Sequence, residues 1–276
     1  MSLMLKLLAT IALLSSFLIA DEQNKKIEDF LKQLYSSNPN IKSLKIKITD
    51  RVDVKEHPGW SAYIVDFDAI LAKENRQASQ KMVWFSDGDV ISKEIFSVND
   101  KKDLKDFVSL TFKSEYYKKE NLIYGNENAK HKVAIFSDPL CPFCKKFVPE
   151  ALEYMKKYPN KFAVYYYHLP LEALHPASVE LSQAAIALEL QGRKDVVLDL
   201  YKINIDPKER VNEVILGTFN KAMNSKITVA DLMSAEVTKH FQSDLEIADK
   251  NMVNGTPTMF FDGVLDKTKN KYKEVK

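Results

Sequence analysis

The feature that most constrains this chain is a pair of cysteines, Cys141 and Cys144, with two residues between them. They are the only cysteines among the 276 residues. The apolar run at 133–136 before them is typical of a buried strand, and residues 145–155 after them carry an apolar face at helical spacing. Cys141 is therefore expected at the N-cap of a helix. Pro142 would take the first helical position, where its missing N–H costs little.

This placement has chemical consequences for the two sulfurs. The first N–H groups of a helix have no partner within the helix, and the helix dipole favours negative charge there. We therefore expect Cys141 to be the exposed, attacking thiolate. Cys144 lies one turn further on the same face, so we expect it to be the buried, resolving thiol.

Two other interpretations of the cysteine pair were considered. A structural zinc ion needs about four Cys or His ligands, but there is no second cysteine pair, and His131, His168 and His175 are not spaced as a ligand set. A purely structural disulfide would close a very short loop and remove little unfolded-state entropy. The sequence favours a redox-active Cys141–Cys144 disulfide, with no metal and no other cofactor.

The composition and the N-terminus limit the setting of this dithiol. With 40 Lys plus Arg and 38 Asp plus Glu, the net charge is +2, which argues against a nucleic-acid partner. Lys6 is followed by an uncharged run to Ala20, which predicts a secretory signal peptide over residues 1–20. An uncleaved anchor is the alternative. Both imply export, and an oxidisable dithiol suits an exported protein.

The remaining pattern predicts two domains. Residues 21–99 read as an α+β domain, with an amphipathic helix at 24–36 followed by antiparallel strands. Residues 100–124 read as a linker helix. Residues 125–276 read as an α/β domain in which a helical insertion, at about 172–252, separates two strands.

Several motifs of the second domain occur together in one known family. A strand leads into Cys-x-x-Cys and a helix, Pro149 follows inside that helix, and Gly255-Thr256-Pro257 precedes a late strand. In this combination the domain resembles the thioredoxin fold of the Dsb-type exported thiol:disulfide oxidoreductases. Asp138, three residues before Cys141, and the separate N-terminal domain are similar to DsbC and DsbG, whereas residues 126–144 and 168–177 are similar to DsbA.

The resemblance implies a periplasmic oxidoreductase or protein disulfide isomerase in which Cys141 and Cys144 are catalytic. It implies roles in substrate binding or tuning for Pro142, Phe143, Thr256 and Pro257, with a cis peptide bond before Pro257. Ile135 stands where DsbA and thioredoxin carry a buried acid, so proton transfer from Cys144 would need water or another group.

The direction of the exchange stays open. The extra domain and Thr256 favour an isomerase or reductase, the DsbA-like stretches leave a disulfide oxidase as the alternative, and a chaperone-like binder of unfolded chains is a hypothesis of another class. The partners implied are unfolded or misoxidised exported proteins, a membrane redox protein that recycles the dithiol, and a second copy of the chain bound through residues 21–99.

Overall fold

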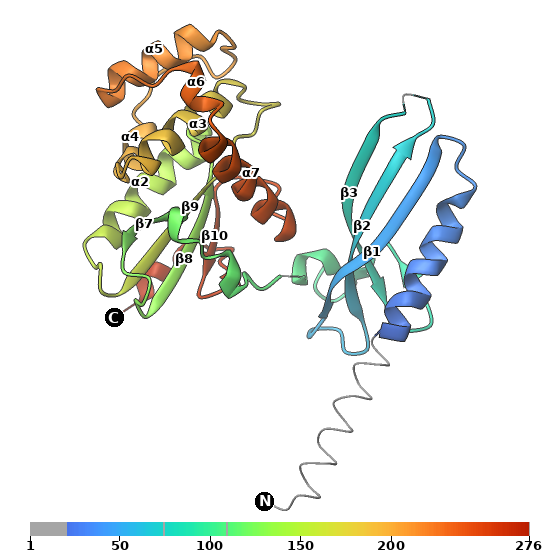
Figure 1. The fold of residues 1–276 in the computed structure, drawn as a ribbon. Helices are drawn as coiled ribbons and strands as arrows, with labels where there is room; N and C mark the ends of the chain where they lie inside the picture. Colours follow the sequence, from blue (N-terminus) through green and yellow to red (C-terminus); the bar gives the residue numbers. More distant parts are fainter. Residues whose placement is uncertain (1–20, 74, 109, 276) are drawn as a thin grey trace, which may run out of the picture. The chain divides into compact units, whose positions relative to one another are not determined.

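The computed structural model describes residues 21–73, 75–108 and 110–275. The signal peptide predicted for residues 1–20 lies outside the described residues. The chain divides into two compact units, with the boundary between residues 109 and 110, and each unit is described by itself (Figure 1).

The first unit is a helix packed on an antiparallel sheet. Residues 21–36 are helical, and the sheet has the order β1-β2-β3-β4. Its strands are β1 (Ile41–Asp53), β2 (Ser61–Leu71), β3 (Gln77–Ser86) and β4 (Ile91–Ser92). Ile27 and Leu31 of the helix are buried with residues of the sheet, including Tyr63 and Val65. Phe30 and Leu34 of the same helix are 46% and 52% exposed, so the apolar side of the predicted amphipathic helix is only partly buried.

The linker helix predicted for residues 100–124 is not formed. A short strand pair, β5 (Phe96–Ser97) with β6 (Lys102–Asp103), leads into that stretch. Three single-turn 3-10 helices follow, and then a strand of the second unit: η1 (Leu104–Phe107), η2 (Ser114–Tyr116), η3 (Lys119–Asn121) and β7 (Leu122–Gly125).

Packing of one aromatic side chain explains this departure. Phe112 is buried against the rings of Phe136, Tyr167 and Phe260, and its N–H donates to the carbonyl of Gly263 at 2.8 Å. Phe112 therefore serves a tertiary contact, which outweighs a weak local helix propensity.

The second unit is built on a five-stranded sheet with the order β11-β10-β8-β9-β7. β8 (His131–Ser137) and β9 (Phe162–His168) are parallel, and the other pairs are antiparallel. α2 (Pro142–Lys156) connects these two strands, and Pro149 lies inside it. β10 (Thr258–Phe261), β11 (Val264–Leu265) and a final 3-10 turn, η4 (Lys271–Glu274), complete the unit.

Helices fill the chain between β9 and β10 (Figure 1). They are α3 (Ala177–Leu190), α4 (Val196–Leu200), α5 (Asn212–Met223), α6 (Val229–Leu232) and α7 (Ala235–Lys250). α6 and α7 are separate because Ser234 caps the start of α7 by accepting from the N–H of Val237. No helix among the described residues is long and apolar enough to span a membrane.

Strand alternation divides the sheet's side chains between two cores. Ile135 and Tyr166 belong to the core that includes α2 and Cys144, whereas Phe136 and Tyr167 belong to the core on the other face. The side chains of β8 and β9 that can reach the dithiol are therefore those on the same face of the sheet as Ile135 and Tyr166.

Candidate active site: the dithiol at the start of α2

The dithiol lies where β8 passes into α2. Cys141 is the N-cap of α2 with an extended backbone conformation (φ −65°, ψ 124°), and Pro142 is the first helical residue. The N–H of Lys145 donates to the carbonyl of Cys141 at 2.9 Å, which closes the first turn. The local geometry expected for the motif is present.

The prediction that Cys141 is exposed is wrong. Cys141 is only 4% exposed and Cys144 is fully buried, and both are free thiols. The cause is the loop before β10, because the Cys141 Sγ lies 3.6 Å from the carbonyl oxygen of Thr256. The exposed part of the motif is Pro142 and Phe143, and Phe143 is 74% exposed.

That loop contains the cis peptide bond expected between Thr256 and Pro257. The Thr258 hydroxyl donates to the carbonyl of Gly255 at 2.7 Å, and Thr258 then pairs with Phe136 of β8. The Thr256 hydroxyl is buried and has no partner in regular hydrogen-bond geometry. The structure thus brings Thr256 against the dithiol.

Burial dominates the chemistry of Cys144. It raises the pKa of the Cys144 thiol to about 12, although the hydroxyls of Ser137 and Thr256 and the backbone N–H of Asp138 oppose the shift. The Thr256 hydroxyl makes no regular hydrogen bond and acts on the thiol as a nearby dipole. Cys144 is therefore a protonated thiol at neutral pH.

A buried carboxylate holds the loop before Cys141. Asp138 is fully buried and accepts five hydrogen bonds, from the backbone N–H groups of Leu140 (2.8 Å), Cys141 (3.2 Å) and Leu171 (2.8 Å), from His175 Nδ1 (2.9 Å) and from the Ser178 hydroxyl (2.6 Å). A carboxylate offers about four lone-pair sites, so this one is saturated. Asp138 fixes the start of α2 to the segment that follows β9.

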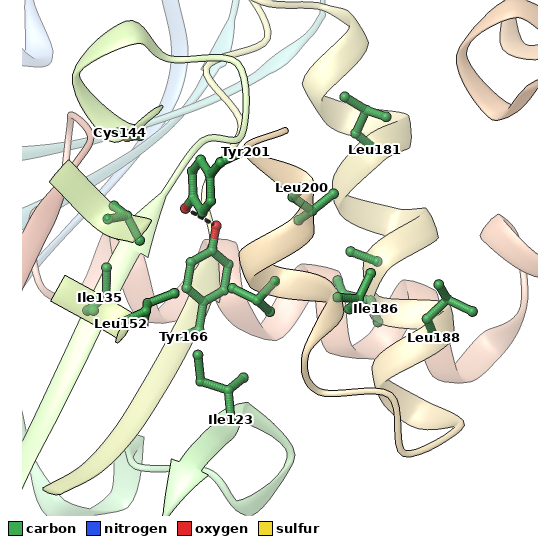
Figure 2. Packing of buried hydrophobic residues seen from close by; sticks show 14 of the residues in the cluster. Ile123, Ile135, Cys144, Leu152, Tyr166, Leu181, Ile186, Leu188, Leu200 and Tyr201 are labelled. Carbon is green, nitrogen blue, oxygen red and sulfur yellow. Dashed lines mark hydrogen bonds between the residues drawn. The ribbon is translucent and has the colours of Figure 1, made fainter. Parts of the chain in front are cut away.

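Three hydroxyls line the core beside Cys144. The Tyr201 hydroxyl donates to Ser137 Oγ at 2.7 Å, and the hydroxyls of Tyr166 and Tyr201 are 2.7 Å apart. Figure 2 shows the two tyrosine rings meeting near Cys144, with Ile135 beside them. Ile135 is fully buried.

Sequence reasoning did not identify these hydroxyls. Ser137 is two residues after Ile135 on β8, so strand alternation places it on the Cys144 side, and Tyr166 is on the same face of β9. That signal was available in the sequence. No local pattern marked Tyr201, which follows the short helix α4.

A second buried polar cluster lies beyond Tyr166. His168 Nε2 is 2.8 Å from Glu189 Oε1, and the His168 N–H donates to Asp244 at 2.8 Å. Asn121 Nδ2 donates to Asp244 at 2.7 Å and lies 3.2 Å from His240 Nε2. Burial raises the pKa of Asp244 to about 7 and lowers the pKa of His240 to about 4. These groups join η3, β9, α3 and α7.

Comparison with known proteins places the second unit in context. A family model described as thioredoxin matches residues 117–276, more than half of the chain. Among solved structures, the catalytic domain of ScsC from Proteus mirabilis is 24% identical over 55% of this chain and 86% of its own, with a TM-score of 0.42. Oxidised BdbD from Bacillus subtilis is 18% identical over 60% of this chain and 92% of its own, with a TM-score of 0.46.

One further match, to a curated protein, covers only part of that protein's length. The Na(+)/H(+) antiporter NhaA 1 of Mycolicibacterium gilvum is 26% identical over 145 residues, which are 51% of this chain and 23% of the antiporter. The match thus spans less than a quarter of that protein.

Proposed function

This chain belongs to the thioredoxin family, and on that premise we propose that it is a Dsb-type thiol:disulfide oxidoreductase that acts on exported proteins in the periplasm. The observation that supports this most directly is the pairing of a helix N-cap cysteine with a buried cysteine one turn later. The cis-proline loop, through Thr256, lies against the sulfur of the N-cap cysteine, Cys141.

The proposed reaction is thiol–disulfide exchange. The Cys141 thiolate attacks one sulfur of a substrate disulfide, forms a mixed disulfide and releases the other substrate sulfur as a thiolate. In isomerisation, that thiolate attacks another disulfide of the substrate. In reduction, Cys144 attacks the Cys141 sulfur, which forms the Cys141–Cys144 disulfide and frees the substrate as a dithiol.

Pro142, Phe143, Thr256 and Pro257 are proposed to contact the substrate or tune the dithiol. The cis bond turns the Thr256 backbone toward Cys141, where a main-chain group can pair with an extended substrate segment. The exposed ring of Phe143 offers an apolar contact beside it. These contacts make an unfolded or misoxidised polypeptide the expected substrate.

The test uses single replacements of the two cysteines. With a scrambled-disulfide protein as substrate, Cys141→Ser should abolish both reduction and reshuffling, because no attacking sulfur remains. Cys144→Ser should retain attack and accumulate a mixed disulfide visible on a non-reducing gel. An undiminished rate of reduction in Cys141→Ser would refute the proposal.

We favour isomerase or reductase over oxidase because the first unit adds a second module to the catalytic one and because Thr256 precedes the cis-proline. A membrane redox protein would recycle the dithiol.

The redox state of Cys141 and Cys144 in intact cells decides between the isomerase or reductase role and the oxidase role. A mostly reduced pair supports the isomerase or reductase, and a mostly oxidised pair supports the DsbA-like oxidase.

Dimerisation through the first unit is part of the proposal. Phe30 and Leu34 leave an apolar strip on the outer side of the helix, and Phe30 lines a small pocket with Val90. The edge strand β1 carries the exposed lysines Lys42, Lys45 and Lys47, which discourage edge-to-edge pairing of sheets. We therefore assign the contact between two copies to the helix rather than to the sheet edge.

A chaperone-like binder remains the second candidate, supported by the same exposed apolar residues. Replacing both cysteines by serine separates the two functions. The oxidoreductase loses its assistance to disulfide-dependent folding, whereas a binder continues to suppress aggregation and assists folding as before.

A further inference from the structure

The resolving step poses a chemical problem at Cys144. This sulfur must become a nucleophile, yet it is fully buried, and burial opposes its ionisation. Ile135, which packs in the same core as Cys144, supplies no acid or base. Some other group must stabilise negative charge as it develops on the Cys144 sulfur.

The hydroxyl chain beside Cys144 has the geometry for this task. Ser137 lies on the face of β8 that packs with Cys144, and it opposes the rise that burial causes in the pKa of the Cys144 thiol. Because the Tyr201 hydroxyl donates to Ser137 Oγ, the Ser137 proton is free to point toward the sulfur. Tyr166, 2.7 Å from the Tyr201 hydroxyl, can donate to Tyr201 in turn. All three hydroxyls can thus be oriented in one direction, toward the sulfur; Figure 2 shows the hydroxyls of Tyr166 and Tyr201 meeting near Cys144.

We propose that Ser137, Tyr201 and Tyr166 are positioning residues whose hydroxyls stabilise the Cys144 thiolate while it resolves the mixed disulfide. This inference rests on the proposed function. In the step, Cys144–SH and the Cys141–S–S–substrate mixed disulfide give the Cys141–Cys144 disulfide and a substrate thiol. One S–S bond forms as another breaks, and the proton lost from Cys144 is regained by the departing substrate sulfur.

Neutral donors suit this position better than a second buried charge. Burial raises the pKa of both Tyr166 and Tyr201 far above neutrality, so both remain protonated donors across the working pH range. Hydrogen bonds to an ionised acceptor are roughly twice as strong as those between neutral groups. The three hydroxyls therefore lower the free-energy cost of forming the Cys144 thiolate without introducing an uncompensated charge into the core.

The test separates the two chemical steps. The reduced protein is mixed with one equivalent of 5,5′-dithiobis(2-nitrobenzoate), whose thiolate product is coloured. A first release reports attack by Cys141, and a second release reports resolution by Cys144. Ser137→Ala and Tyr201→Phe should slow the second release by about tenfold or more at pH 7 and move its pH profile upward, while the first release is unchanged.

The controls distinguish this role from a structural one. Tyr167→Phe removes a buried hydroxyl from the same strand but from the other core, where it donates to the carbonyl of Tyr116, and it should change neither release. Ser137→Thr keeps the hydroxyl and should retain the wild-type pH profile, and Tyr166→Phe should have a smaller effect than Tyr201→Phe.

Two results would overturn the inference and can be told apart. A second release in Ser137→Ala and Tyr201→Phe that stays within twofold of wild type, with an unshifted pH profile, refutes the hydroxyl chain alone. Absence of the first release in the wild-type protein refutes the proposed function, and the proposed role of the hydroxyl chain is refuted with it. If Tyr201→Phe does not fold, the rate and pH profile of the second release in Ser137→Ala, compared with those in Ser137→Thr, test the hydroxyl chain in its place.

Discussion

Cys144 and Asp138 show how single side chains set the properties of the dithiol. Cys144 has no exposed surface, and its thiol is surrounded by hydroxyl and backbone dipoles rather than by charged partners. Asp138 reaches no solvent either, but it is surrounded entirely by donors. Burial therefore keeps the Cys144 thiol neutral, while hydrogen bonds compensate the burial of the Asp138 side chain.

The first prediction concerns the protonation of Cys144. In Cys141→Ser, the remaining thiol should resist iodoacetamide at neutral pH and react only as the pH approaches its pKa of about 12, because the thiolate is the nucleophile. The rate is measured against pH by mass spectrometry under native conditions. Cys144→Ser, which leaves Cys141 alone, is the matched control. Rapid labelling of Cys144 at pH 7 would contradict the buried environment described here.

The second prediction concerns Asp138. Asp138→Asn turns an acceptor that satisfies five donors into a group that presents two N–H donors to them, so unfolding free energy should fall by about 3 kcal/mol. Asp206→Asn is the control, because the exposed carboxylate of Asp206 accepts from the backbone N–H of Lys208 and its replacement should change stability by less than about 0.5 kcal/mol. Chemical denaturation measures both, and equal stability of the two variants would contradict the role of Asp138.

At the scale of elements, the buried polar cluster joins β9 to α3, α7 and η3. A continuous apolar interface would also pack these elements, but the cluster adds specific pairings, such as the Asn121 amide with Asp244. It contains two groups with oppositely perturbed titration, and this makes the helical block sensitive to pH.

The third prediction follows from the signs of these shifts. The pKa of Asp244 is raised from 3.8 to about 7, so the folded protein binds an extra proton in that window, and the group's contribution to stability is lost as pH rises through 7. The pKa of His240 is lowered from 6.5 to about 4, so its contribution is present above 6.5 and is lost as pH falls through 4.

Variants should separate the two contributions. Relative to wild type, Asp244→Asn should gain stability as pH rises from 4 to 7, and His240→Gln should gain stability as pH falls over the same range. The expected scale is a few degrees in the unfolding midpoint, which corresponds to about 1–2 kcal/mol in a domain of this size. Calorimetry at matched ionic strength measures both slopes, and slopes of the same sign would contradict the assignment.

For the molecule as a whole, the main question is which functions belong to the first unit and which to the second. The second unit contains the dithiol, the cis-proline loop and the hydroxyl chain. The first unit contributes a helix with an outward apolar strip. In the proposed function, the second unit performs the exchange, and the first unit brings two copies together.

The fourth prediction tests this division. Phe30→Glu with Leu34→Glu should convert the protein to a monomer and reduce disulfide reshuffling, because two catalytic units are no longer held together. Release of the coloured thiolate by the dithiol should be unaffected. Light scattering at micromolar concentration measures the mass, and Met233→Glu, at an exposed apolar residue of the second unit, is the control. A monomeric wild-type protein would refute the dimer.

Local features of the chain could be predicted because they depend on neighbours in sequence. The N-cap position of Cys141 and the first helical position of Pro142 were expected from the local pattern and are present. The cis bond before Pro257, which the family resemblance implied, is also present. Caps and strand alternation involve residues a few positions apart, so the sequence displays them directly.

Tertiary structure decided what surrounds those features. Cys141 is covered by Thr256, 115 positions away, and Ser137 receives its hydrogen bond from Tyr201, 64 positions away. Residues 100–124 lost their expected helix to aromatic contacts of Phe112 with strands of the second unit. Such contacts form only when distant segments pack, and the burial that results keeps the Cys144 thiol protonated, whereas the sequence alone determines that two sulfurs meet at the start of a helix.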